Sequence, residues 1–214
     1  MNTTPSPFTE DENDLATELF NISMGQAGKA LATLLDAFVE LTVPEIKLVA
    51  AEKIIPTILK DSVFSEEDGI VAFHQDFANK CLAGTTLVIF DDKTKSSIST
   101  ILGMQGKIET VQEMEFMLEL SNILIGACMN SISKQLFNQD MSFANPELVS
   151  EGTNLREMAY STFMRSKLKW GYTLLVKISL YLKNDRFKCD LMIFMSEENT
   201  EVVRTSIQNL MPED

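Results

Sequence analysis

The stretch ELFNISMG at residues 18–25 recurs as ELSNILIG at residues 119–126, with Glu, Leu, Asn, Ile and Gly kept at an offset of 101 residues. The strand-like run LVIF at residues 87–90 recurs in the same way as LMIF at residues 191–194, at an offset of 104. The small difference between the two offsets indicates an insertion between the matched segments. Repetition on this scale predicts that one structural unit has been duplicated in tandem.

Both halves have the same predicted order of secondary structure. In the first half, Thr9 and Glu12 stand at the spacing of a capping box, and a long helix that begins near Asp14, with an apolar face through Phe38, ends before Pro44. The first half then continues with a helix at 51–60, strands at 70–77 and 82–90, and a helix at 93–102. The second half has a helix at 111–137, then Pro146, a helix at 154–164, strands at 172–182 and 187–195, and a helix at 198–210.

We therefore expect an α+β fold in which two repeats, at about 13–105 and 106–214, form a single domain. The two strand pairs would most simply share one mixed sheet flanked by helices, because neither half alone could cover a sheet face. Residues 1–12 are polar and acidic, and the sequence predicts a flexible tail there.

The composition excludes several classes of partner. The formal net charge of −13 argues against a general binder of nucleic acid or of an anionic membrane, since such binding needs clustered Lys and Arg. The one basic cluster, at residues 165–170, is either a solvated turn or a docking patch for a partner. No uninterrupted apolar run approaches the ~20 residues of a spanning helix, and the N-terminus lacks the pattern of a signal peptide. We expect a cytoplasmic protein whose cysteines, Cys81, Cys128 and Cys189, are reduced thiols.

Two groups of polar residues are candidates for chemistry. Asp14, Glu18 and Asn21 are spaced to lie on one stripe of the first helix, opposite its apolar face. A carboxylate on a rigid helix can bind a cationic group, and a carboxamide can hold a water molecule.

The second helix repeats this arrangement with Glu115, Glu119 and Asn122. The alternative interpretation is that these are solvated polar positions kept from one ancestral helix. On that interpretation Gly25 and Gly126, four residues after each Asn, allow close helix packing.

These residues resemble the motif of the CheC/CheX/FliY family of chemotaxis phosphatases. The motif is Asp or Ser, three residues, Glu, two residues, Asn, twenty-two residues and Pro, which this chain matches with Asp14, Glu18, Asn21 and Pro44. The second copy departs from it, because Glu115 stands in place of Asp or Ser and Pro146 comes one residue late. The resemblance covers nearly the whole chain and is strongest to a two-site CheC-like protein. It implies a six-stranded sheet flanked by helices, with the two motif helices exposed.

The resemblance also implies an activity, the hydrolysis of the aspartyl phosphate on a CheY-like receiver domain of a response regulator. Asn21 and Asn122 would orient the attacking water, and Glu18 and Glu119 would pair with the receiver's lysine. Asp14 and Glu115 would support docking, with the first copy doing the larger share of the work. The chain would need no cofactor or metal of its own, because Mg²⁺ is expected in the receiver.

Two other functions stay open on the sequence. The first is a non-catalytic interaction module that binds a receiver or a CheD-like deamidase. The second is a structural adaptor. The lack of room for a flagellar-switch domain counts against this function. The only histidine, His74, falls inside a strand-like run and is expected to be structural.

Overall fold

The computed structural model describes residues 8–94, 110–165, 171–182 and 187–211. Most of the predicted helix at 93–102 and of the basic cluster at 165–170 lies outside the described residues, as does the predicted boundary between the repeats.

The first helix, α1 (Glu10–Leu35), begins at the predicted capping box. Thr9 Oγ1 accepts a hydrogen bond from the Glu12 backbone N–H at 3.3 Å, and Glu12 Oε2 accepts one from the Thr9 backbone N–H at 2.8 Å. Both bonds satisfy donors that the start of a helix otherwise leaves unpaired. The capping box is confirmed. The predicted flexible tail is wrong for its last residues, because Phe8 is buried and residues 10–12 are helical.

The Glu12 carboxylate also holds the last helix, α6 (Glu197–Gln208), against α1. Glu12 is buried, and it accepts hydrogen bonds from Gln208 Nε2 at 2.6 Å and from Arg204 Nε at 3.3 Å. Burial raises the pKa of the Glu12 carboxyl, but the bonds from Thr9, Gln208 and Arg204 outweigh it and leave this pKa below its ordinary value. One carboxylate therefore joins the two ends of the described chain.

The remaining elements follow the predicted order in both halves. The first half continues with β1 (Val39–Leu41), β2 (Glu45–Ala50), the 3₁₀ turn η1 (Ala51–Lys53), α2 (Ile54–Asp61), β3 (Gly69–Ala78) and β4 (Ala83–Asp91). The second half runs through α4 (Thr110–Phe137), β5 (Ser142–Phe143), β6 (Glu147–Asn154), α5 (Leu155–Arg165), β7 (Tyr172–Leu182), β8 (Lys188–Ser196) and α6. The α+β class, both long hairpins and the predicted helices that fall on described residues are confirmed, whereas the short strands β1, β2, β5 and β6 were not predicted.

Each long helix ends at a residue with a left-handed backbone. The φ angle is 46° at Asp36, after α1, and 53° at Asn138, after α4. Asp and Asn adopt this conformation more readily than other residues with a side chain. The first helix therefore stops at Leu35, before Pro44 as predicted, although the predicted apolar face through Phe38 runs past the end of the helix.

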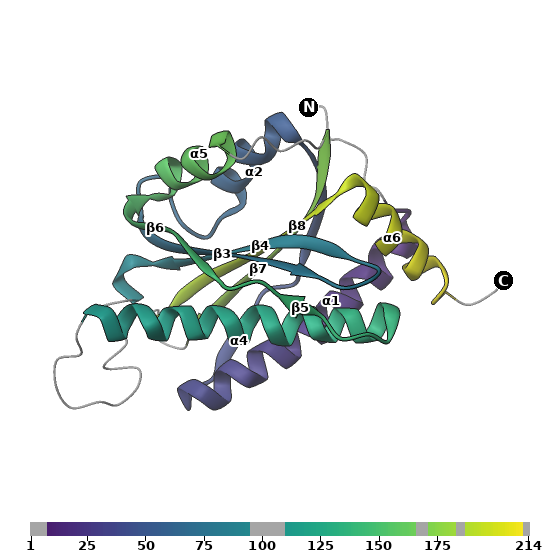
Figure 1. Cartoon of the computed structure of the whole chain (residues 1–214), viewed down its shortest axis with the longest axis horizontal. Helices are drawn as coiled ribbons and strands as arrows, with labels where there is room; N and C mark the ends of the chain where they lie inside the picture. Colours follow the sequence, from purple (N-terminus) through teal and green to yellow (C-terminus); the bar gives the residue numbers. More distant parts are fainter. Residues whose placement is uncertain (1–7, 95–109, 166–170, 183–186, 212–214) are drawn as a thin grey trace.

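The strands form one sheet in the order β1-β7-β8-β4-β3-β5, in which β2 also pairs with β7 and β6 also pairs with β3. Every pairing among the described residues is antiparallel, so the sheet is not mixed as predicted. Figure 1 shows α2 and α5 over one face of this sheet and α1 and α4 along the other. Each face of the sheet has its own apolar core. We call the two faces the α2/α5 face and the α1/α4 face, after the helices that cover them.

Pro44 and Pro146 each interrupt an edge of the sheet. β1 and β2 lie on either side of Pro44, and β5 and β6 lie on either side of Pro146. Proline cannot donate a hydrogen bond to a neighbouring strand, so it is tolerated at an edge. The six strand positions expected from the resemblance are thus filled by eight strands. Each interrupted edge pairs with the hairpin of the other half, so the halves exchange edge strands.

The strand pairings define which residues of the two halves correspond. Glu45, which follows Pro44, pairs with Lys177, and Glu147, which follows Pro146, pairs with His74. Glu45 and Glu147 are equivalent because each follows the proline of its half, so their partners Lys177 and His74 are equivalent as well. Equivalent residues of β3 and β7 therefore lie 103 residues apart in the sequence. On the next strand, His74 pairs with Leu87 and Lys177 pairs with Met192. Leu87 and Met192 are therefore equivalent, and equivalent residues of β4 and β8 lie 105 residues apart in the sequence.

The strand match at offset 104 is therefore out of register by one residue. Leu87 and Met192 both lie on the α2/α5 face, whereas Leu191 lies on the α1/α4 face. Because side chains alternate along a strand, a slip of one residue turns each side chain to the opposite face. The helix offset of 101 fits the burial pattern, since Ala16, Phe20 and Ala27 in α1 and their matches in α4, Met117, Ser121 and Cys128, are all buried.

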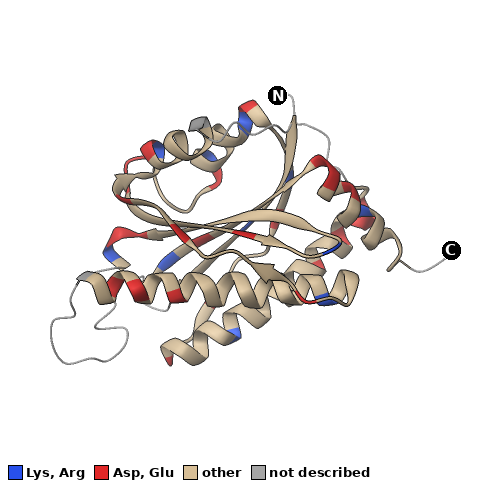
Figure 2. Ribbon diagram, in the orientation of Figure 1, with Lys and Arg blue, Asp and Glu red and all other residues tan. Residues whose placement is uncertain are grey.

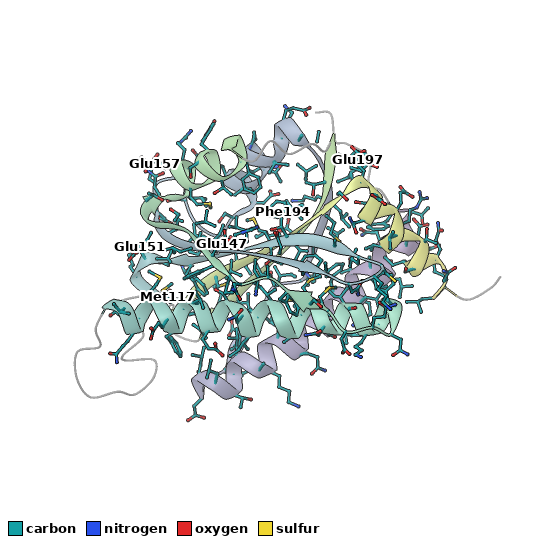
Figure 3. All side chains as sticks on the ribbon, in the orientation of Figure 1. Met117, Glu147, Glu151, Glu157, Phe194 and Glu197 are labelled. Carbon is teal, nitrogen blue, oxygen red and sulfur yellow. The ribbon has the colours of Figure 1, made fainter. Side chains whose placement is uncertain are left out.

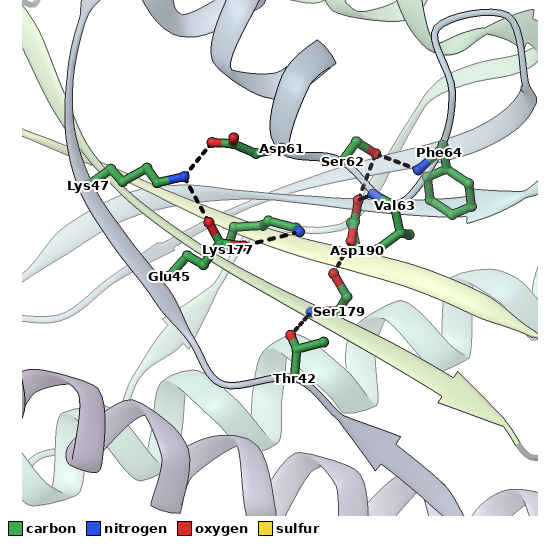
Figure 4. Close-up of polar contacts among 10 residues, drawn as sticks. All are labelled: Thr42, Glu45, Lys47, Asp61, Ser62, Val63, Phe64, Lys177, Ser179 and Asp190. Atoms are coloured by element: carbon green, nitrogen blue, oxygen red, sulfur yellow. Dashed lines mark hydrogen bonds and ion pairs between the residues drawn. The ribbon is translucent and has the colours of Figure 1, made fainter. Parts of the chain in front are cut away.

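A buried carboxylate fastens the first half to the hairpin of the second (Figure 4). Asp190 in β8 accepts hydrogen bonds from Ser179 Oγ at 2.5 Å, from Ser62 Oγ at 2.7 Å and from the Val63 backbone N–H at 3.0 Å. Burial raises the pKa of the Asp190 carboxyl, and these bonds offset only part of that rise. Ser62 and Val63 follow α2, so the network fixes the end of that helix over the sheet.

The long helix α4 is unusually apolar. Among the described residues, Val111–Phe137 is the one helix long and apolar enough to cross a membrane by length and composition, and half of its most apolar window is buried. A helix that packs on both a sheet and a neighbouring helix is expected to be apolar over much of its circumference. The three cysteines are free thiols as predicted, and burial raises the pKa of Cys128 to about 12.

Candidate functional site

The first motif lies on the exposed side of α1. Asp14, Glu18 and Asn21 are all exposed, while the buried residues of α1 face the sheet and α4. Among the described residues, no hydrogen bond or ion pair occupies the Asn21 side chain. The structure therefore brings these three residues together on one open stripe, as the spacing predicts.

The second motif lies on α4, which packs beside α1 on the same face of the sheet (Figure 1). Glu115 and Glu119 are exposed, as expected. Asn122 differs from Asn21, because it is half-buried and its Oδ1 accepts a hydrogen bond from Gln75 Nε2 at 3.1 Å. The two asparagines, equivalent in sequence, are therefore not equivalent in structure.

The two motif glycines do not serve helix packing. A β-carbon built at Gly25 or at Gly126 would have no heavy atom within 4 Å, apart from chain neighbours and the backbone of the same helix turn. Close packing instead occurs at Gly28, where a β-carbon would lie 2.9 Å from Leu41 Cδ1. The packing interpretation of Gly25 and Gly126 is wrong, and each glycine leaves open space one turn after its asparagine.

The surface beside the second motif is acidic and partly apolar. Figure 2 shows acidic residues along the N-terminal half of α4, and Figure 3 labels Glu147 and Glu151 on β6 and Met117 on α4. An open pocket of about 380 Å³ lies there, lined by Val111, Met114, Glu115, Leu118 and Glu151. A docking partner with basic residues would fit this surface better than an acidic one.

Gln75 is the site residue that sequence reasoning missed. It lies on β3 and is buried, where it donates to Ala144 O at 2.8 Å as well as to Asn122. A signal was present in the sequence, because Gln75 interrupts an alternating run of apolar residues, Val71, Phe73 and Phe77, that face the α1/α4 core. A polar side chain at such a position needs a partner, and the partner here is the motif asparagine.

The described residues contain no group of three or more His, Cys, Asp or Glu side chains placed to hold a metal ion. His74 lies on β3, half-exposed, with Nε2 3.0 Å from Asp76 Oδ1. This pair lies on a strand that carries none of the motif residues.

Comparison with known proteins rests on structure. No model of a protein family and no curated protein sequence matches the chain. The solved structure of FliY from Thermotoga maritima matches it with a TM-score of 0.64 and 17% identity, over 96% of this chain and 100% of the solved FliY chain. CheX from Desulfovibrio desulfuricans matches with a TM-score of 0.54 and 11% identity, over 84% of this chain and 99% of CheX. The chain has the CheC/CheX/FliY fold.

The same fold extends to FliM. The FliM middle domain from H. pylori matches with a TM-score of 0.58 and 8% identity, over 93% of this chain and 99% of the domain. Because the CheC/CheX/FliY fold is also that of a FliM domain, the fold alone does not select an activity. The activity has to be argued from the residues exposed on α1 and α4.

Proposed function

We propose that this chain is a chemotaxis phosphatase that hydrolyses the aspartyl phosphate of a CheY-like receiver domain. The observation that carries the proposal is the exposed stripe of Asp14, Glu18 and Asn21 on α1, with open space at Gly25. Polar residues that are held on a rigid helix, and that bind no other side chain in the described part of the chain, are available to a second protein.

The chemistry needs little from the catalyst beyond positioning. A water molecule attacks phosphorus in line with the aspartyl oxygen, the P–O bond to the aspartate breaks, and inorganic phosphate leaves with the water's oxygen. Asn21 would orient that water through its carboxamide, while Glu18 would pair with the receiver's lysine and set the docking register. Asp14 lies one turn before Glu18 and would support the same contact from the rim.

The second copy would contribute through Glu115, Glu119 and Asn122 on α4. Its two carboxylates are exposed like those on α1, so they can pair with a basic partner in the same way. The Mg²⁺ of the reaction would belong to the receiver. We place the protein in the cytoplasm, where CheY-like receivers and CheD-like deamidases would be its partners.

The test is release of inorganic phosphate from a phosphorylated CheY-like receiver, with and without this protein. We expect the protein to raise the rate above the receiver's own hydrolysis, and we expect this only when Mg²⁺ is available to the receiver. A rate unchanged across receivers that bind the protein would reject the phosphatase. A tightly bound transition metal needed for turnover would reject this mechanism.

A second candidate is a non-catalytic module that binds a receiver or another partner. It stays open because the fold also occurs in the FliM middle domain, so the fold alone does not select the phosphatase. Binding of the receiver without any change in phosphate release would support this candidate.

A further inference from the structure

Gln75 restrains one of the two motif asparagines. Its side chain lies under α4, almost fully buried, at 3% exposure. Ala144 O can only accept a hydrogen bond, so the bond of 2.8 Å places the Gln75 nitrogen, and not its oxygen, on that side. The same nitrogen donates to Asn122 at 3.1 Å.

This geometry fixes which end of Asn122 faces inward. A donor at Gln75 requires an acceptor at Asn122, so the Oδ1 atom of Asn122 points into the protein. The Nδ2 group, which can only donate, is left for any contact on the outer side. The Oε1 atom of Gln75 is buried and has no hydrogen-bond partner among the described residues, so it offers Asn122 no second contact.

The first half lacks such a restraint. Equivalent residues of β3 and β7 lie 103 apart, so the counterpart of Gln75 is Ile178, which is fully buried in the α1/α4 core. Isoleucine cannot donate a hydrogen bond. Asn21 is accordingly exposed, and no described residue binds its carboxamide.

The difference decides what each asparagine can do to water. To aim a lone pair of water at phosphorus, the side chain must accept a hydrogen bond from that water, which needs a carboxamide oxygen. Asn21 has this oxygen available. At Asn122 the bond from Gln75 turns Oδ1 into the protein, so the NH₂ group is left on the outer side, where it can bind a phosphoryl oxygen without orienting the water.

We infer that Gln75 is a positioning residue that makes the two sites unequal: it holds Asn122 as a phosphate-binding donor and leaves hydrolysis to Asn21. The inference rests on the proposed function and deepens it. The second site then binds a phosphorylated receiver without dephosphorylating it, so one chain combines a hydrolytic site with a binding site.

The experiment replaces Gln75 in a chain that has lost the first site. Phosphate release is measured for three variants: Asn21→Ala, the double variant Asn21→Ala/Gln75→Ile, and the triple variant that also carries Asn122→Ala. Isoleucine is chosen because it occupies the equivalent position in the other half. We expect Gln75→Ile to raise turnover at least about tenfold above Asn21→Ala alone, and Asn122→Ala to remove the gain. Gln75→Met, which keeps the length of the side chain without its donor, should act in the same way if the isoleucine variant folds poorly.

Thr86→Val is the matched control, because Thr86 donates to the Gln75 backbone oxygen at 2.9 Å from the paired strand, and no hydrogen bond among the described residues joins Thr86 to Asn122. It should leave turnover unchanged. Folded double variants that release phosphate no faster than Asn21→Ala would overturn the inference.

A second measurement separates this inference from the proposed function. The side-chain NH₂ resonances of Asn122 are followed by ¹⁵N NMR in the wild type and in Gln75→Met, without any receiver. A shift in Gln75→Met that is absent in Thr86→Val supports the restraint, and unchanged resonances in both overturn it. If the wild type releases no phosphate from any receiver it binds, the phosphatase fails while this measurement still decides the role of Gln75.

Discussion

Gly25 lies one helical turn after Asn21, and a β-carbon at Gly25 would have no heavy atom within 4 Å outside its own helix turn. The space that this glycine leaves open is therefore space outside the protein, next to the residue proposed to orient water. A glycine inside an exposed helix is unfavourable by about 0.5–1 kcal/mol relative to alanine, so its presence at this position calls for a reason.

The first prediction concerns that space. Gly25→Ala should raise the free energy of unfolding by about 0.5–1 kcal/mol, because it removes backbone freedom from the unfolded chain. Gly25→Trp should fold as well as the wild type but weaken receiver binding at least about tenfold, because the indole fills the approach to Asn21. Binding is measured by titration with the receiver and unfolding by denaturant. Thr33→Trp, exposed near the far end of α1, is the control for bulk, and equal binding by both tryptophan variants would contradict the prediction.

The second prediction ranks the two asparagines. Asn21→Ala should lower the turnover of phosphorylated receiver by about 100-fold, because loss of a positioning contact has that size of effect. Asn122→Ala should lower it less than about threefold, and the double variant should be nearly inactive. Receiver binding, measured separately, should change little in Asn21→Ala. Equal losses from the two single variants would refute the ranking, and wild-type turnover in the double variant would refute the catalytic role of both.

The third prediction concerns docking through Glu18. Glu18→Ala should weaken receiver binding about tenfold and slow association, because the pair with a receiver lysine is lost. The dependence of the affinity on salt should also become shallower, since one ion pair fewer is screened. Glu52→Ala removes an exposed carboxylate from the opposite layer and is the charge-matched control. The same weakening in both variants would indicate a general effect of net charge.

The fourth prediction concerns the Glu12 carboxylate, which binds Thr9, Gln208 and Arg204. Glu12→Ala should lower the free energy of unfolding by about 1–3 kcal/mol at neutral pH, because buried donors lose their acceptor. The pKa of Glu12 is lowered in the fold, so its stabilisation is present above the unfolded pKa of about 4.3 and is lost as the pH falls through the folded pKa. Denaturant unfolding should therefore give curves for wild type and variant that converge in acid. Glu10→Ala, an exposed acid in the same turn, should shift stability by less than about 0.5 kcal/mol.

The fifth prediction has the opposite sign. Burial raises the pKa of Asp190 in the fold, so the native state holds its proton more tightly than the unfolded chain does. The contribution of Asp190 is therefore fully present below the unfolded pKa of about 3.9 and falls as the pH rises through the folded pKa. Relative to Asp190→Asn, the wild type should gain stability as the pH drops from neutral toward 4. A difference that stays constant over this range would contradict the raised pKa.

Much of the fold could be predicted from the sequence because it depends on local patterns. The capping box at Thr9 and Glu12, the apolar face of α1 and the two hairpins involve residues close together in the chain, so their spacing carries the information. The first motif was readable for the same reason. Asp14, Glu18 and Asn21 share a stripe because a helix repeats every 3.6 residues, whatever it packs against.

The edge strands β2 and β6 could not be predicted from local patterns. Both are short, each follows a proline, and each pairs with the hairpin of the other half, so no local pattern identifies its partner. The register between the halves failed for a related reason. The match of residue identities made Leu87 equivalent to Leu191, but the strand pairings make Leu87 equivalent to Met192. Only the strand pairings define which face of the sheet a side chain lies on.

The sequence by itself determined that the chain is duplicated, that it is α+β, and that each long helix carries a Glu and an Asn three residues apart. Only the tertiary structure decided that these two asparagines differ. Asn122 meets Gln75, which lies 47 residues away along the chain, whereas the equivalent strand position under α1 is occupied by Ile178. The spacing of residues along a helix fixes which side a carboxamide takes, but the hydrogen bonds that occupy its oxygen come from strands that only the folded sheet brings beneath it.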